Sequence, residues 1–297
     1  MKSTWKERLK SYLKWAIDSL VILARRTPAG RYAYARIVNH AMEYTQEVNH
    51  SGTKLSFSIP NAINEYRVDS FSTKEPETLE WIDAMQEGSI VWDIGANVGL
   101  YSCYAAKKRG CKVFAFEPSV FNLELLARNI FNNGLLELVT IVPLPLSDEL
   151  SINTLNMTTT EWGGALSTFG QNYGHDGQIM QRVFAFPTIG VTMMDAVELL
   201  KIPQPDYIKM DVDGIEHLIL KEGIQVLSGT KSVLIEINDS FSLQSEDAAM
   251  YLRNAGLSLI AKRHSQDVEE SREFKNAFNQ IWLRTEAHNN PKKGSRL

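Results

Sequence analysis

Cysteine is scarce in this chain, whose 297 residues include only Cys103 and Cys111. Two cysteines form neither a disulfide framework nor a zinc cluster, and both fit small core positions of a reduced protein. Long hydrophobic runs are also missing. The apolar run at 20–24 is too short for a signal peptide, and no stretch approaches the ~20 apolar residues of a membrane span. We therefore expect a cytoplasmic protein.

A surplus of positive charge is missing too. Lys and Arg total 31 against 35 Asp and Glu, a net charge of −4, so the overall charge does not favour nucleic acid as a partner. Hydrophobic residues make up 44% of the chain, an ordinary share for a globular protein. The length allows one large α/β domain. We place it at 51–287, after a helical extension at 1–50 and before a solvated tail at 288–297.

The extension has apolar residues at helical spacing from Trp5 to Leu23, beside a basic row of Lys6, Lys10 and Lys14. A basic amphipathic helix can lie on an anionic membrane surface, here the inner face of the membrane. The same stripe can instead pack on the main domain or on a second copy in a homo-oligomer. We favour packing on protein, because a stripe by itself does not show what it faces.

The main domain shows alternating strand and helix patterns. A β-hairpin at 55–71, turning near Pro60 and Asn61, and a helix at 76–86 precede them. The alternation that follows is typical of a parallel sheet with helices on both faces. The expected strands are 90–94, 112–116, 138–142, 206–210, 232–237, 257–262 and 279–284, and the expected helices are 100–109, 119–132, 192–200, 215–226 and 247–256.

The interval 151–187 interrupts this alternation and is rich in Thr, Gly and Asn. Long insertions at the carboxyl edge of a parallel sheet commonly form lids or substrate loops. We expect this one to cover the acceptor, the substrate of the site described below.

One turn between a strand and a helix carries the strongest signal. Gly95 and Gly99 allow the backbone to approach a ligand closely, and the next helix presents its N-terminal amides to that ligand. Glu117, 18 residues after Gly99, ends the second strand, where a doubly wound sheet places the acid that binds both hydroxyls of a ribose. These features predict an adenosine-type cofactor. A purely structural turn with an incidental Glu117 is the simpler alternative.

The residues of the turn favour one cofactor. A dinucleotide fingerprint needs glycine at 95, 97 and 100, and only Gly95 is present. Asp93, Gly95 and Gly99 instead fill three of the four positions of the S-adenosylmethionine pattern acid-x-Gly-x-Gly-x-Gly, with Asn97 in place of the middle glycine. The Asp93 carboxylate also suits an ammonium group and would repel a pyrophosphate. We predict S-adenosyl-L-methionine, bound by these four residues and Glu117.

Four segments together resemble the FkbM family of S-adenosylmethionine-dependent methyltransferases: DIGANVGLYS at 93–102, AFEPSVFNLELLARNI at 115–130, LSD at 146–148 and IKMDVDGIEHLIL at 208–220. The resemblance implies a Rossmann-like fold with a seven-stranded, mostly parallel sheet. It also implies methyl transfer to a hydroxyl of a sugar, glycan or similar small acceptor. Asn97 is what this family usually shows, whereas Asp213 stands where Glu is commoner.

Methyl transfer needs the acceptor oxygen, methyl carbon and sulfur in line, and a hydroxyl acceptor benefits from a base or a metal. Asp211 follows the strand at 206–210 at the cofactor crevice, so it is the first candidate for catalysis and also for cofactor contact. Glu236 and Asn238 share one face of the next strand and could bind Mg²⁺ with Asp211. A hydrogen-bonding wall for the acceptor explains them better, and we predict no metal. His175, in the insertion, is a candidate base that titrates near neutral pH.

Other polar residues receive smaller roles. Ser147 and Asp148 end the third strand, from which such folds hydrogen-bond an adenine amino group, although Asp148 could equally start a turn. Asp213 and Glu216 precede or open a helix, where capping explains them about as well as catalysis. His217 receives no role.

Two alternative functions stay open. N-methylation of a small amine would use acidic or aromatic residues to hold a cation, and Trp162 and Tyr173 are the aromatic candidates. A non-catalytic regulatory protein would bind the cofactor without turnover, and the intact set of turn residues with Glu117 and Asp211 argues against it.

Overall fold

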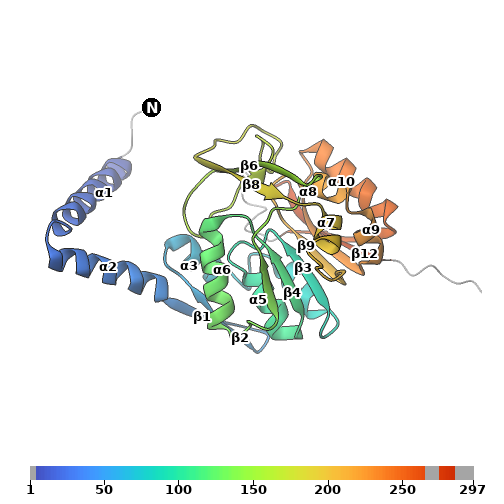
Figure 1. Cartoon of the computed structure of the whole chain (residues 1–297), viewed down its shortest axis with the longest axis horizontal. Helices are drawn as coiled ribbons and strands as arrows, with labels where there is room; N and C mark the ends of the chain where they lie inside the picture. The colour runs from blue at the N-terminus through green and yellow to red at the C-terminus, as the bar shows by residue number, and fades with distance from the viewer. Residues whose placement is uncertain (1–4, 265–273, 285–297) are drawn as a thin grey trace, which may run out of the picture.

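The computed structural model describes residues 5–264 and 274–284, so the predicted tail at 288–297 lies outside the described residues. A seven-stranded sheet forms the centre of the body, in the order β11-β12-β10-β9-β3-β4-β5 (Figure 1). The strands from β10 to β5 run parallel, while β12 pairs antiparallel with β10 and with β11. These strands confirm the predicted sheet: β3 Ile90–Ile94, β4 Lys112–Phe116, β5 Val139–Val142, β9 Tyr207–Met210, β10 Ser232–Asn238, β11 Leu257–Arg263 and β12 Ala277–Arg284.

Helices cover both faces of the sheet because successive strand residues point to opposite sides. Val91 packs with α4, α5 and α6, whereas its neighbour Trp92 packs with α7 to α10. The predicted helix at 215–226 is interrupted at Glu222 and Gly223, which separate two short helices. The helices of the body are α4 Pro76–Asp83, α5 Leu100–Arg109, α6 Val120–Asn132, α7 Met193–Glu198, α8 Glu216–Lys221, α9 Ile224–Gly229 and α10 Ser242–Asn254.

The hairpin lies earlier in the chain than predicted. It consists of β1 (Thr45–His50) and β2 (Thr53–Ser58), and it turns at Ser51 and Gly52, both with positive φ. Asn61 does not turn a hairpin but caps α3 (Ala62–Asp69), where its side chain accepts a hydrogen bond from the Asn64 amide. The prediction was wrong because asparagine favours helix N-caps as well as turns. Residues 45–50, expected to be helical, are therefore a strand.

The insertion contains more regular structure than expected. β6 (Ser151–Met157) pairs antiparallel with β7 (Ser167–Phe169) on one side and with β8 (Phe184–Gly190) on the other. Leu155, Met157 and Phe169 are buried in the core beside α7 and α8. This small sheet fixes both ends of the segment 158–166, which lies beside the turn at 95–99 that follows β3.

The N-terminal extension is an arm of two helices, α1 (Trp5–Ala24) and α2 (Pro28–Glu43), that runs away from the body (Figure 1). Of its described side chains only Met42 is buried, against Val98 and Leu125. The structure therefore does not show the stripe packed on the main domain, one of the two protein surfaces that we favoured, and packing on a second copy stays a prediction. Among the described residues, no helix is long and apolar enough to cross a membrane.

Candidate active site

The carboxyl ends of β3, β9 and β10 open into a cavity of about 450 Å³. A smaller hollow of about 70 Å³ adjoins it, because Gly95, Asn97, Asp211 and Asp213 line both spaces. The turn after β3 therefore separates two compartments. We call them the acceptor cavity, which is the larger, and the cofactor hollow.

The glycines of the turn are needed for its backbone. Gly95 has φ +85° and Gly99 has φ +80°, a region that side-chain-bearing residues rarely adopt. A Cβ on Gly95 would lie 1.9 Å from the Asp211 carbonyl oxygen, so the turn and the end of β9 pack backbone against backbone. Asn97, with φ +50°, adopts the left-handed conformation that asparagine tolerates best after glycine.

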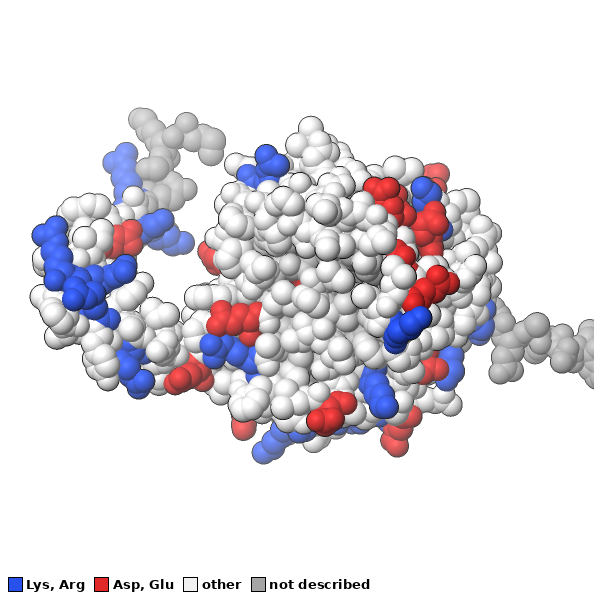
Figure 2. All heavy atoms as spheres, in the orientation of Figure 1, with Lys and Arg blue, Asp and Glu red and all other residues white. Residues whose placement is uncertain are grey.

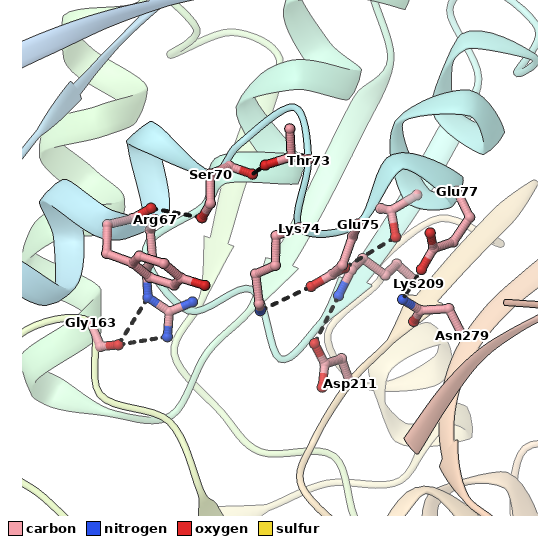
Figure 3. A network of polar contacts seen from close by, with 12 residues as sticks. Arg67, Ser70, Thr73, Lys74, Glu75, Glu77, Gly163, Lys209, Asp211 and Asn279 are labelled. Carbon is pink, nitrogen blue, oxygen red and sulfur yellow. Dashed lines mark hydrogen bonds and ion pairs between the residues drawn. The ribbon is translucent and has the colours of Figure 1, made fainter. Parts of the chain in front are cut away.

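Hydrogen bonds to two adjacent carbonyls fasten the segment 158–166 to this turn and to the helices α6 and α3. Asn97 Nδ2 and Asn122 Nδ2 donate to the Gly164 oxygen at 2.9 and 3.1 Å. Arg67 donates through two nitrogens to the Gly163 oxygen, as Figure 3 shows. The segment also lines the acceptor cavity, and its role as a cover for the acceptor stays a prediction.

Glu117 forms the polar wall of the cofactor hollow. It is 5% exposed and accepts hydrogen bonds from the backbone amides of Asn97 at 2.8 Å and Ser119 at 2.7 Å. Burial raises the pKa of Glu117 to about 8, although these two bonds favour the charged form. Apolar residues complete the hollow, including Leu144 and Leu146. The buried Glu117 carboxyl beside an apolar slot fits a ribose joined to an adenine, while Asp211 and Asp213 line the side that the hollow shares with the acceptor cavity.

Asp93 lies at the base of the acceptor cavity beside the turn. It is buried, and its Oδ2 accepts a hydrogen bond of 2.5 Å from Ser102 Oγ. Its Oδ1 is buried without a hydrogen-bond partner among the described residues. Burial raises the pKa of Asp93, opposed by the positive charge of Lys209. An unpartnered carboxylate oxygen at this place fits the ammonium group of S-adenosylmethionine, so the residues present suit the predicted cofactor.

A charged network that the sequence analysis did not assign crosses the acceptor cavity (Figure 3). Lys209 is 4% exposed and its Nζ lies 3.2 Å from Asp211 Oδ2. Burial alone would lower the pKa of Lys209, but Asp211, Glu75 and Asp93 outweigh it and raise that pKa. Burial would likewise raise the pKa of Glu75, but Lys74, 3.1 Å away, and Lys209 hold it at about 2. Lys209 and Glu75 therefore both stay charged at neutral pH.

The predicted catalytic carboxylates meet at the same place. Asp211 and Glu236 both line the acceptor cavity, from the ends of β9 and β10. Burial, followed by repulsion from Asp211, raises the pKa of Glu236 well above its ordinary value. The same two causes raise the pKa of Asp213 to about 7, and Asp213 Oδ2 accepts a bond from the Ser167 amide. Asn238 does not line the described cavity, and its Oδ1 accepts hydrogen bonds from the backbone amide and the hydroxyl of Ser240. Asn279 of β12 lines the cavity instead.

The remaining predicted residues lie outside both spaces. Ser147 and Asp148 follow the end of β5 by five and six residues, and neither lines the cofactor hollow as described. Asp148 lies 3.9 Å from Lys221. His175 stacks on Phe274 at 4.8 Å between ring centroids and does not line the described cavity.

Glu216 does not have the capping role that was weighed for it, because α8 begins after Ile215 without a side-chain cap hydrogen bond. Its oxygens accept from the amides of Val212 and Gly214 and from the side chain of Gln244. His217, which received no role, is buried near Phe241.

Sequence reasoning missed Glu75 and Lys74, which line the cavity without belonging to a motif, and it gave no role to Tyr101, which stands inside the quoted segment at 93–102. Lys209 stands inside the quoted segment at 208–220, so its position in that motif was the available signal. Within the described residues no group of three or more His, Cys, Asp or Glu is placed to hold a metal ion.

Comparisons with known proteins show which family the chain resembles. The model of the methyltransferase FkbM domain matches residues 93–259, from the first acid of the turn through β10 into β11. The hexuronic acid methyltransferase AglP of Haloferax volcanii is 22% identical over 220 residues, covering 73% of this chain and 83% of that protein.

Solved structures with a similar fold are more distant in sequence. The precorrin-6y C5,15-methyltransferase of Geobacter metallireducens matches with a TM-score of 0.41 and 16% identity, over 71% of this chain and 86% of the other. A SAM-dependent methyltransferase of Aquifex aeolicus matches with a TM-score of 0.41 and 13% identity, over 75% and 97%. Because the domain model covers more than half of the sequence, including Asp93 and Asp211, the chain belongs to the FkbM methyltransferase family and is an S-adenosylmethionine-dependent methyltransferase.

Proposed function

We propose that this methyltransferase acts on a hydroxyl group of a sugar or glycan-like acceptor. The wall of the acceptor cavity carries this proposal: Glu75, Asp211 and Glu236 stand there beside the amide of Asn279. Carboxylate and amide oxygens accept hydrogen bonds from hydroxyl groups, and the amide NH₂ donates to them. The relative AglP is named for a hexuronic acid, which supports the same class of acceptor.

The proposed cofactor contacts follow from the two compartments. Asp93 Oδ1 accepts from the ammonium group, Glu117 binds the two ribose hydroxyls, and the apolar slot at Leu144 and Leu146 surrounds the adenine. Gly95, Asn97 and Gly99 shape the turn between these contacts. S-adenosylmethionine, when bound, supplies an electrophilic methyl carbon. Ser147 and Asp148 receive no cofactor contact in this proposal, since neither lines the cofactor hollow.

The proposed chemistry places Asp211 between cofactor and acceptor, because it lines both compartments. With S-adenosylmethionine bound, the Asp211 carboxylate would take the proton of the acceptor hydroxyl as that oxygen receives the methyl group. Glu236 adjoins Asp211 and shares that proton, as closely spaced carboxyls do. Lys209 holds Asp211 in place through its 3.2 Å contact. His175 has no part in this step.

The amine alternative loses its aromatic support. Tyr173 packs against Phe241 and Trp162 packs beside Val98 and Leu125, and neither lines the described acceptor cavity. A cation would still be attracted by the carboxylates, so amines belong in the test.

The test is transfer of a labelled methyl group from S-adenosylmethionine to a panel of neutral saccharides, saccharides with uronic acid residues, and small amines. We expect label on a saccharide as a methyl ether, which withstands mild base. A base-labile product would identify a carboxylate as the acceptor, and label on amines alone would favour N-methylation. Either result would contradict the proposal. A deoxy analogue that lacks the methylated hydroxyl is the matched control.

A further inference from the structure

The arm formed by α1 and α2 leaves much apolar surface uncovered. Nine large apolar side chains of α1 are exposed, among them Trp5 at 71%, Trp15 at 64% and Leu20 at 66%. Soluble monomers rarely expose apolar patches larger than a few hundred Å², and larger patches mark interaction surfaces. Helices in proteins gain most of their stability from packing of an apolar face, and on this arm only Met42 is buried among the described side chains. The arm therefore has the properties of a surface that binds a partner.

The arm differs in charge from the rest of the chain. Residues 5–43 carry eight Lys and Arg against three Asp and Glu, a net charge of +5. Since the whole chain carries −4, the remainder carries −9. Figure 2 shows Lys and Arg gathered on the arm, apart from the mixed charges of the body. The charge of the arm suits an anionic partner.

The arrangement of residues on α1 selects the kind of partner. Trp5, Leu9, Leu13 and Leu20 share one face, because they recur at helical spacing. Aromatic residues on an apolar face and basic residues on the others are typical of a helix that lies in the interface of a bilayer. A crossing orientation is excluded for the described helices, none of which is apolar enough.

Other occupants fit the arm less well. The body of the same chain buries only Met42 among the described side chains of the arm. Pairing of two arms from two copies would bring two charges of +5 together, which is unfavourable. We propose that α1 docks on an anionic phospholipid surface, with its apolar face in the headgroup region and its lysines beside the lipid phosphates. This inference goes beyond the proposed function and does not depend on the identity of the acceptor.

The experiment is flotation of the full-length protein with vesicles of phosphatidylcholine, alone or mixed with phosphatidylglycerol. We expect binding to the mixed vesicles that weakens as salt rises from about 0.1 M to about 1 M, because the screening length falls from about 10 Å to about 3 Å. The variant Leu9→Ser/Leu13→Ser should lose more than about 100-fold in affinity, since two apolar side chains leave the bilayer.

Charge is tested separately with Lys10→Gln/Lys14→Gln, which keeps helix propensity. Each lysine near an anionic surface contributes about a fivefold factor, so affinity should fall about 10- to 25-fold. The matched control is Lys54→Gln/Lys112→Gln, two exposed lysines of the body, which should bind vesicles like the unchanged protein. Cofactor affinity should be unchanged in all three variants, which shows that each is folded.

Two results would overturn the inference. One is the absence of vesicle binding at low salt. If light scattering then shows a dimer, a second copy of the chain is the occupant of the arm. The other is equal binding to neutral and anionic vesicles that the Lys10 and Lys14 changes leave unaltered.

Discussion

The two compartments of the active site are built differently. The polar contact that marks the cofactor hollow comes from residues close in the sequence: Glu117, at the end of the strand next to β3, accepts hydrogen bonds from two backbone amides, one of them in the turn after β3. Later segments of the chain complete the apolar wall of the hollow. The acceptor cavity instead draws its charged side chains from elements far apart in the sequence, such as Glu75 before α4, Asp211 after β9 and Glu236 in β10. The turn with Glu117 is therefore visible in the sequence, whereas the charged wall exists only after distant segments have packed together.

This difference separates binding from chemistry. A buried carboxyl with backbone partners holds a ligand in one position, whereas charged groups packed around a common space alter one another's pKa values and so adjust proton transfer. Changes on the cofactor side should therefore affect cofactor affinity, and changes on the acceptor side should affect turnover. Four predictions test this division.

The largest effect is expected from Asp211→Asn. This change keeps the size of the side chain but removes the proton acceptor, so turnover should fall about 10²- to 10⁴-fold. Cofactor affinity, measured by calorimetry, should change little. The control is Asp206→Asn at the opposite end of β9, where an asparagine oxygen can still accept from the Ile90 amide. Near-normal turnover of Asp211→Asn would show that alignment alone drives the reaction.

The cofactor side should respond in the opposite way to Glu117→Ala. Loss of the hydrogen bonds to two ribose hydroxyls costs about 0.5–1.5 kcal/mol each, or about 1–3 kcal/mol together, which weakens cofactor binding about 5- to 150-fold. Turnover at saturating cofactor should be largely kept. Ser147→Ala is the control, because Ser147 does not line the hollow, and it should bind the cofactor normally. Weaker binding by Ser147→Ala would restore the contact that the sequence predicted.

Turnover should depend on pH through Glu236. Burial and the neighbouring Asp211 raise the pKa of Glu236, so the folded protein keeps this proton at a pH where a free glutamic acid has lost it. Removal of the proton from the substrate hydroxyl requires an ionised carboxyl group to receive it. Turnover should therefore fall as pH decreases through the pKa of Glu236, by about tenfold per pH unit. In Glu236→Gln the fall should move to lower pH. An unchanged profile would remove Glu236 from the proton pathway.

The smallest effect is expected from Asn97→Gly in the turn. Glycine removes the cost of the left-handed backbone but also removes the bond to the Gly164 oxygen, and each contributes about 1 kcal/mol. Stability from thermal unfolding should stay nearly unchanged. Asn97→Ala loses the bond and keeps the strain, so it should be less stable by about 1–2 kcal/mol. Equal stability of the two variants would show that the backbone of the turn is not strained.

Much of the body could be predicted from the sequence because its signals are local. The alternation of apolar strands and amphipathic helices predicted all seven strands of the central sheet. The misplaced hairpin shows the limit of such signals, since Asn61 favours a turn and a helix cap alike and only its partner, the Asn64 amide, distinguishes them. Ser147 and Asp148 do not end a strand, because β5 ends at Val142, as the expected strand at 138–142 does. Their contact with the cofactor stays a prediction.

The sequence by itself determined the fold class, the turn from Asp93 to Gly99 with Glu117, and the presence of Asp211 at the end of a strand. Each rests on residues close together in the chain, where backbone sterics and strand periodicity act. Tertiary structure alone decided that Glu75 and Lys209 join Asp211 in one cavity, that Asn238 and His175 lie outside it, and that the apolar stripe of α1 faces away from the body. Burial, pKa shifts and uncovered surfaces depend on which distant segments pack together, and no local pattern contains that information.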